Sequence, residues 1–390
     1  CAVSATIAVA GHPLLALPAA MIAGACAGFI TAFLQTKLKI PSILAGIITN
    51  TGLYTVNLAV MGFSSNVNMV KADTMFSLVK PYLGSFYKLI PAAVLTVAVG
   101  VLLTLFLKTR LGLSIRATGD NPDMVRASSI NTAFTVTVGL CLSNAMTALS
   151  GAVLAQYQKT ADINLGTGMV IIGLASLIIG ETLMPKGKTW MKALGAILGS
   201  ILYLSGLPVH HCHRPAARSA QRMPEADLRR HRGAGHRPAG HQIRSPPRSQ
   251  RRESLMLQIS HISKTFNPGT VNEKKALNGV DLHLDAGDFV TILGSNGAGK
   301  STLFGAIAGS FVVDEGTIRL DGQNITNLPD YKRSKFIGRL FQDPLKGTAP
   351  SMTIEENLAL AYLRASEKRS PFSVVTAKDR AGFREKLAQL

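Results

Sequence analysis

The residues best suited to chemistry form one short glycine-rich stretch, from Gly294 to Ser301. Its spacing, G-x-x-x-x-G-K-[ST], is that of a loop whose backbone N–H groups converge on phosphate oxygens. Lys300 can reach the β- and γ-phosphates of a nucleotide, and the Ser301 hydroxyl can bind Mg²⁺. The alternative is a glycine-rich turn without a ligand. We expect a nucleotide site made by Gly294, Ser295, Asn296, Gly297, Ala298, Gly299, Lys300, Ser301 and Thr302.

The flanking residues predict the elements that this loop needs on either side. Residues 288–293 are an apolar run typical of a buried strand, and 301–309 is a helical run closed by Gly309. The order strand, loop, helix is the setting that the motif requires. The other elements expected in 256–390 are strands at 257–262, 280–285, 317–320 and 336–341, a turn at Asp321-Gly322, a helix from a capping box at Thr353 to about 363, and a helical tail from Thr376.

The first half of the chain has a different composition, because apolar residues crowd into 1–209. Its long apolar runs approach the roughly 20 residues that cross a bilayer, and they are rich in small residues that let membrane helices approach closely. A buried helix of a soluble protein explains any single run, but not six in series. The expected spans are 5–34, 41–63, 89–107, 131–155, 168–184 and 191–209.

The net charge of +19 is compatible with nucleic-acid binding, but its distribution favours a membrane protein. Basic residues follow the first, third and fifth spans, and loops rich in Lys and Arg lie on the cytoplasmic side. We therefore expect 35–40, 108–130 and 185–190 to be cytoplasmic, whereas the less basic 64–88 and 156–167 are external. Nucleic acid is not an expected partner.

The cytoplasmic loop at 108–130 contains a small element of its own. Asn121 is suited to cap a helix, Pro122 to its first position, and Asp123 to its positive end. The pattern predicts a short amphipathic helix that ends near Ser129. It is either an inert capped turn or a docking helix for a cytoplasmic partner.

Residues 210–255 resemble neither flank. Eleven Arg and no Lys occur in 210–252, and no apolar periodicity remains, so this segment cannot build a core. A basic arm for RNA or lipid headgroups is one interpretation. The interpretation we favour is out-of-frame translation of a permease end, with Met256 as the start of an adjacent reading frame.

Residues 256–345 resemble the N-terminal part of the nucleotide-binding domain of ABC transporters. The resemblance rests on Phe266, on the loop with Thr302, and on Phe341-Gln342-Asp343-Pro344. It implies ATP and Mg²⁺ as cofactors, stacking of Phe266 on adenine, and a catalytic and metal-binding role for Gln342 beside the attacking water. Phe266 as a core aromatic and Gln342 as an ordinary loop residue are the alternatives.

Residues 1–209 resemble the permeases of branched-chain amino-acid importers, most specifically in Arg116-Ala-Thr-Gly-Asp-Asn-Pro122, which is similar to that family's cytoplasmic coupling loop. The implied fold is a polytopic α-helical membrane domain (1–209, about six spans), a seam (210–255) and a truncated α/β P-loop domain of ABC type (256–390). The implied partners are second permease and ATPase subunits, a periplasmic solute-binding protein and membrane lipid. The implied location is a bacterial inner membrane, with the ATP-binding part in the cytoplasm.

The sequence also departs from the family that it resembles. It contains no Leu-Ser-Gly-Gly-Gln signature, no second acidic strand end and no switch histidine. We therefore expect an importer component that couples ATP to uptake of a small solute in its system, but that binds nucleotide without turnover as this polypeptide. The alternatives are a chimera of gene fragments without function, and a membrane-tethered P-loop protein with a basic arm for nucleic acid.

Overall fold

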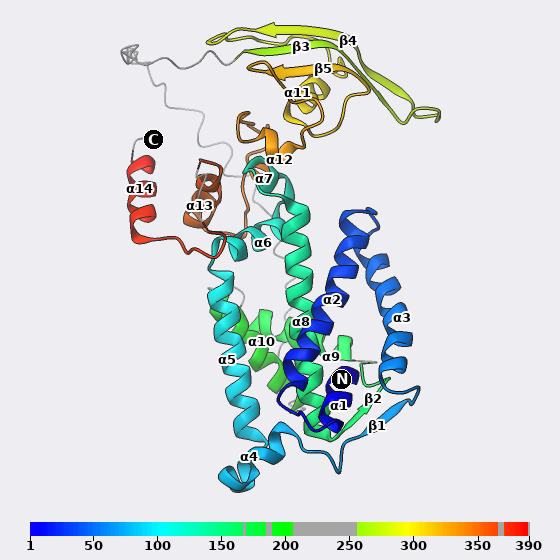
Figure 1. The fold of residues 1–390 in the computed structure, drawn as a ribbon. Coiled ribbons are helices and arrows are strands. Elements are labelled where there is room, and N and C mark those ends of the chain that lie inside the picture. Colours follow the sequence, from blue (N-terminus) through cyan, green and yellow to red (C-terminus); the bar gives the residue numbers. More distant parts are fainter. Residues whose placement is uncertain (167–168, 185–188, 206–255, 366–369, 389–390) are drawn as a thin grey trace, which may run out of the picture.

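The computed structural model describes residues 1–166, 169–184, 189–205, 256–365 and 370–388. Figure 1 shows a helical part, which comes first in the chain, and an α/β part placed beyond one end of it. The predicted seam at 210–255 lies outside the described residues, as does the end of the predicted sixth span.

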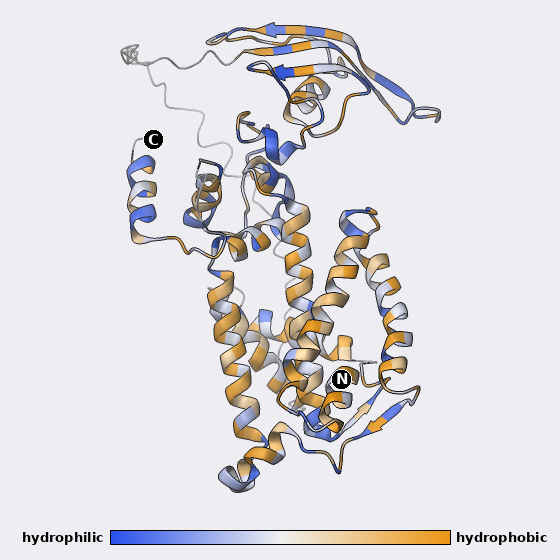
Figure 2. Cartoon of the chain, viewed as in Figure 1, coloured by the Kyte–Doolittle hydropathy of each residue, from blue (hydrophilic) through white to orange (hydrophobic). Residues whose placement is uncertain are grey.

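The helical part contains the apolar segments that the sequence predicts. Within the described residues, α2, α3, α5 and α8 are long and apolar enough to cross a membrane, whereas α9 and α10 are shorter. Figure 2 shows these helices as predominantly hydrophobic along their length. The bounds are α1 Ala2–Val9, α2 Ala16–Thr36, α3 Ser42–Val60, α4 Met75–Leu83, α5 Leu89–Leu107, α8 Thr132–Gln158, α9 Met169–Leu183 and α10 Thr189–Leu204.

Small residues bring α2 and α8 together. A Cβ on Gly24 or Gly28 would lie 2.5 Å from a backbone carbonyl oxygen of α8, that of Asn144 or of Leu140. Contacts of this kind bind membrane helices through close packing, because the lipid tails offer no hydrophobic driving force between them. By contrast, none of the most apolar window of α5 is buried within the described part of the chain.

The predicted first span, 5–34, is wrong as a single helix. The structure ends α1 at Val9 and begins α2 at Ala16. Gly11, at φ +92°, adopts a conformation that other residues rarely take, and Pro13 has no N–H for a helical hydrogen bond. The apolar composition continues across this break, and for that reason a hydropathy pattern alone does not reveal it.

The end of the helical part away from the α/β part is closed by a short sheet and a buried amide. Strands β1 (Asn66–Asn68) and β2 (Thr160–Asp162) pair antiparallel and join two of the predicted external loops. The side chain of Gln156 is 1% exposed; it donates to the Pro13 carbonyl at 2.9 Å and accepts from the Met75 N–H at 2.8 Å. It therefore ties the break before α2 to the start of α4.

Two short helices lie between the membrane helices and the α/β part. Helix α7 (Pro122–Ala127) is the helix predicted from Asn121, whose side chain accepts from the Met124 N–H at 3.1 Å. The preceding helix, α6 (Arg110–Asp120), was not predicted. It is capped by Thr109, which accepts from the Gly112 N–H.

The α/β part is built on a four-stranded antiparallel sheet in the order β4-β3-β5-β6, against which α11 packs. The β5–β6 turn has positive φ at Asp321 and Gly322, as a type I′ hairpin requires, so the predicted turn is confirmed. The bounds are β3 Leu257–Phe266, β4 Lys274–Leu284, α11 Lys300–Ala308, β5 Glu315–Leu320, β6 Gln323–Asn324, α12 Asp330–Arg333, η4 Pro344–Gly347, α13 Ile354–Ala365 and α14 Ala377–Leu387.

Two predicted strands of this part, 288–293 and 336–341, are wrong, because neither segment forms a strand. Phe289 is 96% exposed and Leu340 is 99% exposed. A buried strand needs neighbours on both sides to complete its hydrogen bonds. Within the described residues no strand pairs with either segment. The apolar pattern therefore predicted a burial of these two segments that the described residues do not provide.

Candidate nucleotide site and its contact with the membrane helices

Two glycines of the glycine-rich loop have a left-handed backbone conformation. Gly297 and Gly299 lie at φ +86° and +88°, a region in which side chains other than hydrogen cause strain. Gly299 is also the N-cap of α11, and a Cβ there would lie 2.6 Å from the Ala276 carbonyl oxygen. The loop therefore presses against β4 and leads directly into the positive end of a helix, as predicted.

Lys300 lies over the same loop. Its ammonium donates to the carbonyl oxygens of Gly294, at 2.6 Å, and Ser295, at 2.7 Å. A phosphate that enters the loop would meet this cation, and the exchange of carbonyl partners for phosphate oxygens strengthens each hydrogen bond through the added negative charge.

Three of the predicted phosphate and metal residues meet around one cavity of about 1190 Å³, whereas residues 294–299 and Thr302 do not line it. Lys300, Ser301 and Gln342 all line it, although 40 residues of sequence separate the last two. Asp123 and Arg126 of α7 line the same cavity. A serine hydroxyl and an amide oxygen are hard ligands, of the kind that Mg²⁺ accepts alongside water and phosphate. Within the described residues no cluster of three His, Cys, Asp or Glu side chains provides another metal site.

Phe266 lies at the end of β3 and does not line this cavity. Its ring packs edge-to-face on Phe311 with centroids 5.3 Å apart. Lys264 lies near both rings and pairs with Asp314 at 2.6 Å, a contact that, through the hydrogen bond from Lys264, lowers the pKa of the Asp314 carboxyl. The residue opposite Phe266 in the sheet, Lys274, reaches toward Gly297. Phe266 therefore packs on Phe311, opposite a residue that reaches the loop, and both interpretations of Phe266 remain predictions.

Helix α7 docks on the segment that follows Gln342. The Asn121 side-chain amide caps α7 through its oxygen, and its nitrogen donates to three backbone carbonyls of the α/β part, at 2.7 to 3.1 Å. The neighbouring Asp120 carboxylate accepts from the Ser351 N–H at 2.9 Å. The carbonyls bound by Asn121 belong to Leu345, Lys346 and Thr348.

An apolar core joins the two parts beneath these hydrogen bonds. Residues of α6 and α7 pack on residues at and near α13, and Arg116 pairs with Glu356 at 2.7 Å. Burial raises the pKa of the Glu356 carboxyl, but hydrogen bonds from Thr353 and Arg116 together outweigh burial, and the pKa is lowered. The buried members of this core are Leu113, Ala117, Met124, Val125, Ala349, Met352 and Leu360.

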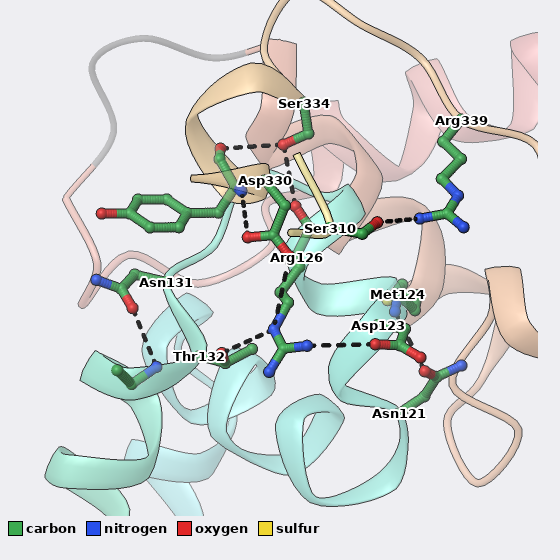
Figure 3. A network of polar contacts seen from close by, with 12 residues as sticks. Asn121, Asp123, Met124, Arg126, Asn131, Thr132, Ser310, Asp330, Ser334 and Arg339 are labelled. Atoms are coloured by element: carbon green, nitrogen blue, oxygen red, sulfur yellow. Dashed lines mark hydrogen bonds and ion pairs between the residues drawn. The ribbon is translucent and has the colours of Figure 1, made fainter. Parts of the chain in front are cut away.

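A second polar contact joins α7 to α12 (Figure 3). The Ser334 hydroxyl donates to the Arg126 carbonyl at 3.0 Å and lies 2.9 Å from the Ser129 hydroxyl. The Arg126 guanidinium lies between Asp330, at 3.8 Å, and Asp123, at 3.4 Å. Ser334 and Asp330 were not predicted as contact residues, because neither belongs to a recognisable motif.

A third contact attaches the beginning of α6 to the last described segment. The N–H groups of Arg110 and Leu111 donate to the carbonyls of Ser373 and Pro371 at 2.9 and 2.8 Å. The Arg110 side chain forms a buried ion pair with Asp379, 3.7 Å apart. Asp379 also completes the capping box of Thr376 at the start of α14. The residues of this capping box are close in sequence, whereas its arginine partner lies far away in the chain and has no local signal.

Comparison with known proteins accounts for both parts. Residues 1–205, more than half of the chain, match the family described as branched-chain amino acid transport system / permease component. The chain belongs to this permease family. Residues 277–389 match the family described as ABC transporter, so the permease part is joined to an ABC-type ATP-binding part. Both resemblances stated from the sequence are confirmed.

Individual relatives match one part each. The tyrosine transport system permease protein of Clostridioides difficile (strain R20291) is 36% identical over 191 residues, which are 49% of this chain and 62% of the relative. The tyrosine transport ATP-binding protein of that strain is 48% identical over 107 residues, 27% of this chain and 42% of the relative. An uncharacterised protein of Rickettsia prowazekii (strain Madrid E) is 32% identical over 198 residues, 50% of this chain and 69% of the relative. The chain thus spans about three fifths of the tyrosine permease relative and about two fifths of the tyrosine ATP-binding relative.

Proposed function

We propose that this chain is a component of an ABC importer in which Mg-ATP, bound at residues 294–302, drives uptake of a small solute across a bacterial inner membrane. The observation that carries the proposal is the shared cavity. Lys300 and Ser301 of the nucleotide loop line it together with Gln342 and with Asp123 and Arg126 of the permease helix α7. Binding or loss of the nucleotide phosphates would therefore occur beside α7, the helix that docks the membrane part on the α/β part.

The individual residues have separate roles in this proposal. Backbone N–H groups of the loop and Lys300 hold the β- and γ-phosphates, and Ser301 and Gln342 provide oxygen ligands for Mg²⁺. Gln342 also orients the attacking water. Phe266 provides an aromatic face for adenine at the edge of the loop.

An amino acid is the solute class that the relatives support, and tyrosine is the first to test, because the printed names of both Clostridioides relatives specify it. The partners proposed are second permease and ATPase subunits, a periplasmic solute-binding protein and the surrounding lipid. Hydrolysis also needs charge stabilisation on the γ-phosphate. The 390 residues contain no signature sequence to provide it, so we propose that this polypeptide binds Mg-ATP without appreciable turnover.

The test is nucleotide binding by the full chain in lipid nanodiscs, measured with a fluorescent ATP analogue and Mg²⁺. Lys300→Ala removes the cation that faces the phosphates, so the Kd should rise at least about tenfold, the loss of one charged hydrogen-bonding partner. Lys335→Ala is the matched control, because Lys335 is an exposed lysine of the same part that does not line the cavity. Phosphate release is recorded in parallel and should not exceed that of Lys300→Ala.

Two results would contradict the proposal. If a folded Lys300→Ala variant bound the fluorescent nucleotide as tightly as the unsubstituted chain, residues 294–302 would not be the nucleotide site. Turnover at the roughly 1 s⁻¹ or more of ordinary enzymes, abolished by Lys300→Ala, would show that the chain supplies its own transition-state charge.

A further inference from the structure

The helix that begins at the nucleotide loop is held at its other end by one buried arginine. Arg333 is 1% exposed, and its guanidinium donates to four backbone carbonyls. Two belong to the last turn of α11, those of Ala306 at 2.6 Å and Ile307 at 3.0 Å. The other two belong to Leu328, at 2.8 Å, and Thr326, at 2.7 Å.

This arrangement fixes α11 to α12 with little freedom. The last carbonyls of a helix have no partners within it and carry the negative end of its dipole, so a guanidinium is suited to bind them. Burial lowers the pKa of Arg333 and the Asp330 carboxylate opposes the shift, but an arginine retains its charge in any ordinary buffer. Gly309 leaves room for the side chain, because a Cβ there would lie 2.8 Å from the Arg333 Nε.

The next residue in the chain touches the permease. Ser334 is 8% exposed and donates to the carbonyl of Arg126 in α7 (Figure 3). Its hydroxyl also lies 2.9 Å from that of Ser129, which follows α7. A continuous series of contacts therefore runs from the loop, along α11, through Arg333 to Ser334 and α7. Helix α11 has nine residues, so it carries the loop's position across about 13 Å as one rigid element.

We propose that Arg333 and Ser334 are positioning residues that transmit the occupancy of the nucleotide loop to α7, as a route separate from the Gln342 segment. The proposal rests on the proposed nucleotide site and adds two residues outside the nucleotide loop, of which Ser334 lines the shared cavity and Arg333 does not. Phosphates that draw the loop inward move α11 along its axis. Arg333 transfers that movement to α12, because it is a residue of α12 and binds two carbonyls of α11. Ser334 then changes its hydrogen bonds to Arg126 and Ser129. The Gln342 segment contacts α7 elsewhere, through Asn121.

The experiment measures hydrogen exchange of the full chain in nanodiscs by mass spectrometry, with and without saturating Mg-ATP. In the unsubstituted chain, Mg-ATP should change the exchange of the peptide covering 121–131 by about fivefold, the lower range of coupling between sites. Ser334→Ala should abolish at least half of this nucleotide-dependent change, although the Kd for the fluorescent nucleotide stays within about twofold. A role in stability alone would alter exchange equally with and without nucleotide.

Matched variants sharpen the test. Ser310→Ala removes a serine at the same end of α11 that bonds Arg339 and not α7, so it should retain the full response. Ser334→Thr keeps the hydroxyl and should restore the response. Arg333→Lys keeps the charge but cannot bind four carbonyls, so it should lose the response. If that variant does not fold, the Ser334 series decides the question alone.

Two outcomes overturn the inference without touching the nucleotide site. They are a full response in Ser334→Ala, and binding of Mg-ATP to the unsubstituted chain with no change at 121–131. Failure of the unsubstituted chain to bind Mg-ATP would instead refute the proposed function itself, and the inference with it.

Discussion

Two glycines of the nucleotide loop show how far residue spacing predicts structure. The motif requires glycine at 299 and allows any residue at 297, yet both lie at positive φ. Their surroundings differ. A Cβ on Gly299 meets a backbone oxygen at 2.6 Å, whereas the nearest atom for a Cβ on Gly297 is the flexible end of Lys274, at 4.0 Å. The motif thus requires glycine at position 299, where a side chain would both strain the backbone and collide with a neighbouring carbonyl.

Substitution by alanine should separate these two effects. Gly297→Ala adds only the strain of a left-handed residue, about 1–2 kcal/mol, which nucleotide affinity tolerates in part. Gly299→Ala adds the same strain and displaces the loop from β4, so affinity for the fluorescent nucleotide should fall to background. Nucleotide titration and thermal unfolding of both variants in nanodiscs measure the difference. Equal losses in the two would mean that crowding against Ala276 is unimportant.

At the scale of elements, helix starts that are marked by nearby capping residues could be predicted from the sequence, whereas contacts between distant segments could not. The caps at Asn121 and Thr353 predicted the starts of α7 and α13, because capping residues act on the backbone beside them. The helical tail predicted from Thr376 is α14. Helix α6 escaped prediction, since it is short and contains Gly112 and Gly119, which lower its intrinsic helix propensity. Its long-range partners in the α/β part likewise have no signature in sequence.

Two neighbouring ion pairs of α13 test how much its polar contacts contribute. Arg116–Glu356 joins α13 to α6 with both side chains about a quarter exposed, whereas Arg380–Glu355 has the same 2.7 Å distance but about half-exposed side chains. Double-mutant cycles with glutamine should give a coupling energy of about 1–2 kcal/mol for the first pair and below about 0.5 kcal/mol for the second, because solvent screens exposed charges. Local opening free energies of α13 from hydrogen exchange provide the measurement.

The same cycle has a pH dependence whose sign is fixed. The pKa of Glu356 is lower in the folded chain than in the unfolded chain. Its carboxylate therefore stabilises the contact fully above the unfolded-state pKa, and this stabilisation is lost as pH falls through the folded-state pKa. The coupling energy of Arg116 and Glu356 should decline in acid below the ordinary range for glutamate, about pH 4. A coupling energy that rises in acid would contradict the assignment.

At the scale of the whole molecule, the sequence predicted two parts and their order, and the structure adds how they meet. What it could not predict is the state of 288–293 and 336–341. An apolar run predicts burial only when other segments are present to cover it, and Phe289 and Leu340 are exposed among the described residues. A strand in a sheet is a property of its neighbours as much as of its own residues.

The last prediction concerns the orientation of the membrane part. Lys and Arg follow α2 and α5, and Figure 1 places the α2–α3 connection and α6–α7 at the end that carries the ATP-binding part, with β1 and β2 at the other end. Helix α8, with 27 residues, is about 40 Å long, enough to cross the roughly 30 Å of hydrocarbon and extend to α7. The end with α7 should therefore face the cytoplasm, as the basic loops predict.

Cysteine labelling of right-side-out vesicles with an impermeant maleimide tests this orientation in a background without native cysteines. Ser65 precedes β1 and Asp123 lies in α7, elements at opposite ends of the helical part (Figure 1), and both residues are exposed. Ser114 is 4% exposed and would react poorly from either side. Ser65→Cys should react in intact vesicles, and Asp123→Cys only after permeabilisation. Because a charged reagent cannot cross the hydrocarbon core, reaction of Asp123→Cys alone in intact vesicles would require the opposite orientation and would place the nucleotide loop outside the cell.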